Sequence, residues 1–341
     1  MAIIIIMANL PDRENIIEKI LLGPQLGVVL YSVLDLNIPQ ILESGPKTSE
    51  EISQIVHTVP EKLHRVLLAL ETEDIFRFNP QTNQFSNSQT SRLFLNENYA
   101  GCAKMCLLPF RYELLTAFPE SLRTTTSLPE IKYKKSYLQY LITNPENMDK
   151  YLEGAKFHVK YTCPDLVRAI NLSDINRVLD VGGYDGTLLI ELSKVYPQIT
   201  GAVYNETHFR PIATKKIEEE LLSNRLKALA GNYIDAVPEG YECIILENVL
   251  RTFPDNVVVS ILTNCKKALI SGNKLYCVDY ILDKNHQTYQ FERILDIRVL
   301  GLNNGKVRSR DEIQAIFERA GLRITNFIPA VKQWVIESHA M

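Results

Sequence analysis

The chain has 341 residues, of which 46% are hydrophobic and 23% are charged, a composition typical of a soluble globular enzyme with two cores. Its formal net charge is -3 and no run of Lys and Arg stands out, which argues against a general nucleic-acid binder because phosphate neutralisation needs a basic face. The six cysteines lack CxxC or Cys/His metal spacing, so we expect free thiols, a reducing cytoplasmic setting and no metal site.

The first segment in chain order is the hydrophobic run 3–6, which is too short for the apolar core of a signal peptide. No later segment reaches the roughly 18 apolar residues of a membrane span, so we expect no membrane partner. From residue 13 to about 160, apolar residues recur at helical spacing. The segment Thr48–Glu51 is a possible capping box at the start of a short helix, and Pro60 begins another helix.

Two short strand-like pieces follow within residues 75–88, on either side of a segment rich in turn-forming residues. Helices followed by such a hairpin predict a winged-helix module. In a winged helix that binds DNA, the segment 60–76 would carry recognition, but acidic residues outnumber Lys62 and Arg65 there. That balance is unfavourable for contact with a phosphate backbone, so we expect no DNA partner.

From about residue 175, strand-like and helix-like segments alternate, with short glycine turns between them. This alternation predicts an α/β fold with a parallel, doubly wound, Rossmann-like sheet. The expected strands are 177–183, 199–205, 226–232, 241–249 and 274–282, and the expected helices are 187–196, 210–222, 255–270 and 310–322. The last two segments, 324–330 and 332–338, predict a final antiparallel pair.

A strand–turn–helix segment at Val178–Gly186 reads VLDVGGYDG, at the position where a doubly wound sheet binds a nucleotide. A glycine turn alone is a weak signal. However, the chain resembles the dimeric small-molecule O-methyltransferases that use S-adenosylmethionine, of the plant caffeate type and their bacterial natural-product relatives. The segments that carry this resemblance, in the family's order, are 34–53, 180–186, 230–233, 247–256, 275–282 and 303–322.

The resemblance implies an S-adenosylmethionine cofactor, a small-molecule natural-product substrate and an intertwined homodimer. It also implies three regions. These are an all-α winged-helix dimerisation domain at 1–105, a helical linker with substrate-pocket helices at 106–172, and the Rossmann-like domain at 173–341. The cofactor residues that it implies are Asp180, Gly182, Tyr184, Gly186, Asn205, Asn232 and Tyr233.

Three of these cofactor positions depart from the family pattern. The turn normally reads DVGGGxG, and Tyr184 replaces its third glycine, where a side chain crowds the approach of a ligand to the backbone. Asn205 stands where the family has an acid for the ribose hydroxyls, and Asn232 where it has an aspartate near the adenine. Each loss of a carboxylate weakens cofactor binding by roughly 1–2 kcal/mol, so we expect binding of S-adenosylmethionine to be impaired, unless Asp185 or Glu206 compensates.

The expected proton-abstracting residues depart further. The family's general base is a histidine in a VLHDW-like segment, and Arg251 occupies that place in VLRTF. Arginine stays protonated at working pH and cannot accept a proton. The glutamate that orients the histidine is replaced by Val307, whereas the supporting acid survives as Asp279. Asp279 is therefore the expected ion-pair partner of Arg251, because a buried guanidinium needs one.

The sequence leaves three functions open. The first is a non-methylating enzyme of the pericyclase, cyclase or isomerase type, as in methyltransferase-fold pericyclases, with Arg251 polarising a substrate carbonyl. The second is a working S-adenosylmethionine-dependent methyltransferase with an atypical site, and the third is a non-catalytic partner of a heterodimer.

His158 lies on a helix that lines the pocket in the family, so it is either an acid–base residue or an ordinary helix-surface histidine. Tyr184 either fills an empty cofactor pocket or stacks on a ligand.

Overall fold

The computed structural model describes residues 14–282, 290–330 and 333–340, so the hydrophobic run 3–6 lies outside the described residues. The chain forms two compact units. The first comprises residues 1–116 and 145–158, and the second comprises residues 117–144 and 159–341. The long helix α12 (Pro145–Ala169) contributes its first part to one unit and its second part to the other. The region boundaries at 105 and 172 stay a prediction.

The first unit is mainly helical, as expected, with a small antiparallel sheet of strand order β1-β3-β2. Ile38, Ile52, Leu67, Phe76 and Phe85 have no exposed surface and form its core. The predicted hairpin is present as β2 and β3, while the winged-helix assignment stays a prediction. The elements are α2 (Glu14–Asp35), α3 (Ile38–Ile41), η1 (Leu42–Ser44), β1 (Lys47–Thr48), α4 (Ser49–Val56), α5 (Pro60–Glu71), β2 (Phe76–Asn79), β3 (Gln84–Asn87), α6 (Gln89–Arg92), η2 (Leu93–Leu95), α7 (Glu97–Cys106) and α8 (Pro109–Leu115).

Local sequence explains where α4 and α5 begin. The backbone N–H of Glu51 donates to Thr48 Oγ1 at 3.2 Å, and the backbone N–H of Thr48 donates to Glu51 Oε2 at 2.7 Å. This is the predicted capping box, which satisfies two amide donors that the helix itself cannot bond. Pro60 begins α5 as its first residue, where a missing amide proton costs nothing.

The second unit holds a seven-stranded sheet of order β11-β12-β8-β7-β4-β5-β6. The strands β4, β5, β6, β7, β8 and β11 run parallel, and β12 runs antiparallel between β8 and β11. The predicted doubly wound sheet and its final antiparallel pair are confirmed. The strands are β4 (Arg177–Val181), β5 (Thr200–Asn205), β6 (Leu226–Ala230), β7 (Tyr241–Glu247), β8 (Leu269–Asp279), β11 (Leu322–Ala330) and β12 (Gln333–Ala340).

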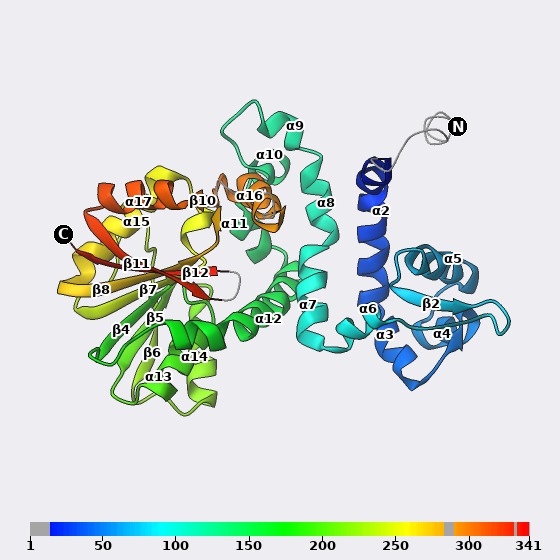
Figure 1. Ribbon diagram of the computed structural model, residues 1–341, viewed down its shortest axis with the longest axis horizontal. Coiled ribbons are helices and arrows are strands. Elements are labelled where there is room, and N and C mark those ends of the chain that lie inside the picture. Colours follow the sequence, from blue (N-terminus) through cyan, green and yellow to red (C-terminus); the bar gives the residue numbers. More distant parts are fainter. Residues whose placement is uncertain (1–13, 283–289, 331–332, 341) are drawn as a thin grey trace. The chain divides into compact units, whose positions relative to one another are not determined.

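Helices cover both faces of this sheet (Figure 1). One face packs against α13 (Thr187–Val195), α14 (Arg210–Glu219) and the second part of α12, and the other against α15 (Asp255–Ala268) and α17 (Arg310–Arg319). The helix expected at 255–270 ends at Ala268, because β8 already begins at Leu269. The remaining elements of this unit are α9 (Phe118–Ser121), α10 (Leu128–Tyr133), α11 (Tyr137–Ile142), η3 (Leu250–Thr252), β9 (Ile281–Leu282), α16 (Gln290–Asn303) and β10 (Arg308–Ser309).

Two whole-chain expectations concern membranes and metals. Within the described ranges, no single helix is long and apolar enough to cross a membrane, although one bent pair, 20–35 with 38–44, passes by length and composition alone. The same ranges hold no cluster of three or more His, Cys, Asp or Glu side chains that could bind a metal ion.

Candidate active site

The carboxyl ends of the parallel strands β4, β5, β7 and β8 lie along one edge of the sheet, where doubly wound folds bind ligands. Arg251 lies in the short turn η3 just beyond β7, and Asp279 is the last residue of β8. Arg251 Nη1 lies 3.0 Å from Asp279 Oδ1, and its backbone N–H donates to Asp279 Oδ2 at 3.0 Å. The predicted ion pair is therefore present, and it is largely buried.

Both hydrogen bonds of the Arg251 side chain to described residues use Nη1, which donates to Asp279 and to Asn248 Oδ1. The guanidinium also lies over the ring of Tyr280, 5.3 Å from its centre. Among the residues that the structure describes, Nε and Nη2 donate to none. A charged, rigid fork with two donor nitrogens left over can bind a carbonyl, carboxylate or phenolate oxygen.

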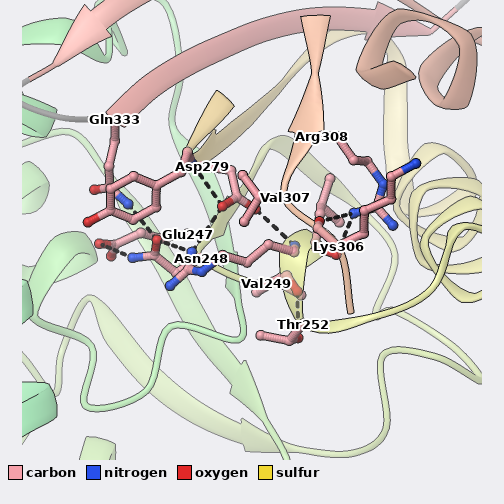
Figure 2. A network of polar contacts seen from close by, with 12 residues as sticks. Glu247, Asn248, Val249, Thr252, Asp279, Lys306, Val307, Arg308 and Gln333 are labelled. Atoms are coloured by element: carbon pink, nitrogen blue, oxygen red, sulfur yellow. Dashed lines mark hydrogen bonds and ion pairs between the residues drawn. The ribbon is translucent and has the colours of Figure 1, made fainter. Parts of the chain in front are cut away.

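Asn248 connects Arg251 to two further side chains (Figure 2). Its amide oxygen also accepts from the amide nitrogen of Gln333 at the start of β12, and its Nδ2 donates to Glu247 Oε1 at 3.2 Å. The backbone of Asn248 is left-handed, with φ of 60°, a conformation that Asn tolerates better than most residues. This turn sets the Asn248 side chain between Glu247, Arg251 and Gln333.

Arg308, the first residue of β10, stabilises the turn η3 that contains Arg251. Its guanidinium is 4% exposed. It donates to the backbone oxygens of Leu250 at 3.0 Å and Phe253 at 2.8 Å, and its Nε donates to Asp255 Oδ1 at 2.9 Å. The two carbonyls flank η3 on either side of Arg251. Arg308 therefore holds both ends of this turn, and Asp255 balances its charge.

Val307, which we expect at the place of an orienting glutamate, is fully buried. Its backbone N–H donates to Asp296 Oδ1 at 2.8 Å, while the neighbouring N–H of Lys306 donates to the backbone oxygen of Arg251 at 2.9 Å. The side chain at 307 has no polar atom, so it cannot orient a base. A fixed cation, Arg251, therefore occupies the place where the resemblance leads us to expect a proton acceptor.

The glycine turn after β4 keeps the backbone shape of a ligand-binding turn. Gly182 and Gly186 have φ of 76° and 81°, and Tyr184 is also left-handed, with φ of 48°. Its ring packs edge-to-face on Phe209, at 6.0 Å between the ring centres. The side chain that replaces the third glycine is therefore held against the start of α14.

The carboxylate of Asp185, in the same turn, is hydrogen-bonded to Thr187, the first residue of helix α13. Its Oδ1 accepts from the backbone N–H of Thr187 at 3.0 Å and from the Thr187 hydroxyl at 2.7 Å, and Lys216 lies 2.6 Å from its Oδ2. A carboxylate at a helix N-terminus is favoured by the helix dipole. Asp185 is therefore not placed to compensate for the missing ribose acid.

Two buried carboxylates lie at the ends of β4 and β7. Asp180 has no exposed surface, and neither of its oxygens has a hydrogen-bond partner among the described residues. Burial, together with the nearby charges of Glu247 and Asp185, holds the pKa of Asp180 well above its usual range. Burial also raises the pKa of Glu247 to about 7, although the Arg251 guanidinium opposes that shift. Both acids therefore retain protons at a pH where ordinary carboxyls have lost them.

Asn205 and Asn232, the two asparagines at expected cofactor positions, both form hydrogen bonds with neighbouring residues. Asn205 Nδ2 donates to the backbone oxygen of Tyr184 at 3.2 Å, so the side chain supports the glycine turn. Asn232 donates to Asp235 Oδ2 at 2.8 Å and accepts from the backbone N–H of Ile234 at 3.0 Å. Tyr233 packs edge-to-face on Phe253, with 6.2 Å between the ring centres.

These contacts decide how well S-adenosylmethionine fits. Its ribose diol and adenine amine call for strong acceptors, and Asn205 and Asn232 have neither the charge nor the second oxygen of a carboxylate. Glu206 is half-buried, and burial raises its pKa, which weakens it as a replacement. The left-handed glycines Gly182 and Gly186 suit a nucleotide-binding turn, whereas the neutral amides of Asn205 and Asn232 are a poor fit for the ribose and adenine.

The remaining predicted residues lie in the first unit. His158 is half-buried on α12, at the end of the part that belongs to that unit, and its role in catalysis stays a prediction. The segment Phe110–Tyr112 lies in α8, and Phe110 is 7% exposed.

Three residues of the site were missed from the sequence. Glu247, Arg308 and Gln333 each lie within a predicted or matching segment (247–256, 303–322 and 332–338), but no pattern assigned them a role. An acid at the last position of a buried strand, directly before the glycine-free turn 248–252, was the available signal for Glu247. No local pattern marks Gln333, because its partner Asn248 lies 85 residues away.

Comparison with known proteins places this chain in a family. The profile of the O-methyltransferase domain matches residues 122–323, and that of the O-methyltransferase dimerisation domain matches residues 19–97. One similar protein is "Probable inactive O-methyltransferase 11" of Dictyostelium discoideum, which is 26% identical over 96% of this chain and 98% of its own length.

Solved structures share the fold over nearly the whole chain. The mitomycin 7-O-methyltransferase MmcR superposes with a TM-score of 0.91 at 21% identity, covering 96% of this chain and 98% of that one. The O-methyltransferase NcsB1 from neocarzinostatin biosynthesis, in complex with S-adenosylmethionine and 2-hydroxy-5-methyl naphthoic acid, gives 0.82 at 20% identity, covering 94% and 96%. With both domain profiles matched in order along the sequence, the chain belongs to the O-methyltransferase family.

Proposed function

We propose that this protein is a cytoplasmic enzyme of natural-product biosynthesis that catalyses a non-methylating isomerisation or cyclisation. In this reaction Arg251 donates hydrogen bonds to a carbonyl oxygen of the substrate. The observation that carries the proposal is the buried Arg251–Asp279 pair at the position of the family's base. Because arginine cannot accept a proton, base-assisted methylation of a neutral hydroxyl has no acceptor at this position.

The same pair suits the stabilisation of negative charge. Asn248 and Asp279 hold Nη1, while Nε and Nη2 point their hydrogens elsewhere, and Arg308 keeps the turn η3 in place. A donor that is fixed before the reaction stabilises a developing oxyanion by about 3 kcal/mol. A substrate carbonyl in contact with Nη2 would become more electrophilic, and its neighbouring C–H bonds more acidic.

Binding of an oxyanion tests the role of Arg251. The naphthoic acid bound by NcsB1 is a suitable probe, because it carries a carboxylate and a phenol on a flat ring. We expect calorimetry to show that Arg251→Ala binds 2-hydroxy-5-methyl naphthoic acid at least about tenfold more weakly than the wild type, a loss of about 1.4 kcal/mol. Arg323→Ala, an exposed arginine on β11, is the control. Equal affinity of wild type and Arg251→Ala would remove Arg251 from substrate recognition.

A second candidate function is methyl transfer to an acceptor that needs no base, such as an ionised phenol. The retained left-handed glycines, Gly182 and Gly186, favour it. Calorimetric titration with S-adenosylmethionine and S-adenosylhomocysteine separates the two functions. We expect no binding below millimolar concentration for the wild type, and a gain of at least tenfold in Asn205→Asp/Asn232→Asp, but not in the exposed control Asn256→Asp. Micromolar binding by the wild type would favour methyl transfer instead.

A third candidate is a non-catalytic subunit, which the name of the Dictyostelium relative favours. The dimerisation-domain match supports a homodimer for this chain. Isolation of a stable complex with a second, different methyltransferase chain would favour the non-catalytic role, and a homodimer that binds the naphthoic acid through Arg251 would count against it.

A further inference from the structure

Glu247 is the acidic residue nearest to Arg251 that the ion pair does not use. It ends β7 and is 9% exposed. Its Oε1 accepts from Asn248 Nδ2, and the Thr162 hydroxyl bonds to the same carboxyl group. The amide of Asn248 also accepts from Arg251 Nη1. One short side chain, Asn248, is therefore hydrogen-bonded to both the Glu247 carboxyl and the Arg251 guanidinium.

Three other carboxyls near this edge, those of Asp279, Asp185 and Asp180, are either bound by neighbouring groups or closed off from a ligand. Asp279 is bound through one oxygen by Arg251 Nη1 and the Tyr280 N–H and through the other by the Arg251 N–H. Asp185 is bound by Thr187 and Lys216, and Asp180 has no exposed surface at all. Glu247 alone among these four combines some exposure with an oxygen that only neutral groups contact.

The charges around Glu247 favour a group that gains and loses its proton near neutrality. Burial raises its pKa to about 7, and Asp185 and Asp279 add to that shift, while Arg251 and the Thr162 bond oppose it. An acid–base group is most effective when its pKa lies near the working pH. At neutral pH, about half of such carboxyls are charged and half are protonated.

We propose that Glu247 is the proton-transferring residue of this site, acting on a carbon next to the carbonyl that Arg251 binds. This inference rests on the proposed function of Arg251. The substrate class is a cyclic ketone or enone with an acidic C–H beside its carbonyl. Arg251 supplies the positive charge and Glu247 supplies the base, and Asn248 sets the distance between them.

The proposed proton transfer needs no reactant besides the substrate and the protein. The Glu247 carboxylate takes a proton from the carbon next to the carbonyl, the C–H electron pair forms a C=C bond, and the carbonyl electrons move to oxygen as an enolate held by Arg251. Glu247 then returns its proton to the same carbon or to the far end of a conjugated enolate. The second outcome is an isomerisation, and the first is an exchange that heavy water reveals.

Exchange of 2-tetralone in heavy water is the test, followed by NMR as the loss of its C1 proton signal. We expect the wild type to accelerate exchange over buffer, and Glu247→Gln to lower the protein-dependent rate by at least about 100-fold. The control Glu239→Gln removes an exposed carboxyl before β7 and should retain the wild-type rate. The rate should rise about tenfold per unit below pH 7 and level off above it, because the charged carboxylate is the active form.

The outcomes separate this inference from the proposed function. Loss of exchange in both Glu247→Gln and Arg251→Ala supports both. Wild-type exchange in Glu247→Gln with loss in Arg251→Ala overturns the role of Glu247 and leaves that of Arg251. Equal naphthoic acid binding by wild type and Arg251→Ala overturns the proposed function itself. No acceleration of 2-tetralone exchange by the wild type, or a Glu247 carboxyl ¹³C titration centred near pH 4.5, also overturns the inference.

Discussion

At the scale of single residues, the charges at several positions of the site differ from those expected for its family. A cation, Arg251, stands where a proton acceptor is expected, and amides stand where two carboxylates are expected. Two acids of the site, Asp180 and Glu247, are buried near strand ends. Two buried acids beside one paired guanidinium make a site whose charge depends on pH, and this dependence also affects folding.

Stability should fall as the pH rises through the range in which Glu247 loses its proton. In the unfolded chain, Glu247 has its ordinary pKa of 4.5, and in the folded protein the pKa is about 7. The folded state therefore holds the proton more tightly, its advantage is complete below pH 4.5, and it disappears as the pH rises to 7. That shift corresponds to a loss of folding free energy on the order of 3 kcal/mol, and Asp180 acts in the same direction.

Urea denaturation at pH 5, 6, 7 and 8 measures this effect. The wild type should lose stability across the series, and Glu247→Gln should lose clearly less, because glutamine carries no proton to release. Glu239→Gln should follow the wild type. A wild-type stability that does not change between pH 5 and 7 would contradict the raised pKa.

The sequence predicted the Arg251–Asp279 pair but not the importance of Glu247. The pair followed from a matched motif and from the rule that a buried guanidinium requires a counter-charge. Its place at the end of a buried strand was the one local signal for Glu247, but its raised pKa depends on burial in the folded sheet and on contacts with residues far away in the sequence, such as Thr162 in helix α12. Asn205 and Asn232 were predicted as weak cofactor ligands, but their bonds to Tyr184 and Asp235 depend on backbone geometry that no sequence pattern encodes.

At the scale of elements, Arg251 lies in the short turn η3, and a residue of a neighbouring strand, Arg308 in β10, stabilises that turn. The turn η3 has few internal bonds of its own, and Arg308 in β10 supplies bonds at both of its ends. Since β10 pairs with β9, directly after β8, the position of Arg251 is tied to the edge of the main sheet.

Removal of the Arg308 side chain should weaken both the fold and the site. Arg308→Ala leaves carbonyls of Leu250 and Phe253 without their donors and Asp255 without its partner, a change that typically costs about 3–5 kcal/mol for a buried charged group. Guanidinium denaturation should show this loss, with Arg323→Ala within about 0.5 kcal/mol of the wild type. A loss under 1 kcal/mol for Arg308→Ala would show that η3 is held by other contacts.

The start of α4 offers a simpler test of local structure. Thr48→Ala removes the cap oxygen that accepts from Glu51 N–H, and it should cost about 1 kcal/mol. Thr48→Ser keeps the hydroxyl and should retain most of the stability, as measured by thermal unfolding. Equal effects of the two substitutions would mean that the cap hydroxyl contributes nothing.

At the scale of the whole molecule, the strand order was predictable in outline only. Alternating strands and helices predicted the parallel sheet, and the segments 324–330 and 332–338 predicted an antiparallel pair. The insertion of β12 between β8 and β11 could not be read from the pattern, because apolar alternation gives the faces of a strand and not its neighbours. The assembly of chains likewise depends on surfaces rather than on local pattern.

The dimerisation-domain match and the surface of α2 lead to a prediction about assembly. Ile20, Leu21 and Leu22 on α2 are 69%, 51% and 45% exposed in the single chain, within the matched residues 19–97. We expect analytical ultracentrifugation to show a dimer, and Ile20→Glu/Leu21→Glu to weaken association by at least about tenfold, or about 1.4 kcal/mol. Leu221→Glu, which alters an 88% exposed leucine of the other unit, should remain dimeric, and an unaffected Ile20→Glu/Leu21→Glu dimer would exclude α2 from the interface.

The strand order also governs how the chain can fold while it is being synthesised. The strand β11 bonds within the sheet only to β12, and β12 follows it in sequence. A nascent chain that has emerged from the ribosome as far as residue 330 therefore has β11 with no strand to pair with, and the outer edge of β8 is open as well. When Gln333–Ala340 leaves the exit tunnel, β12 can pair with β8 on one side and with β11 on the other. The sheet at this end is therefore completed only after these residues have been synthesised.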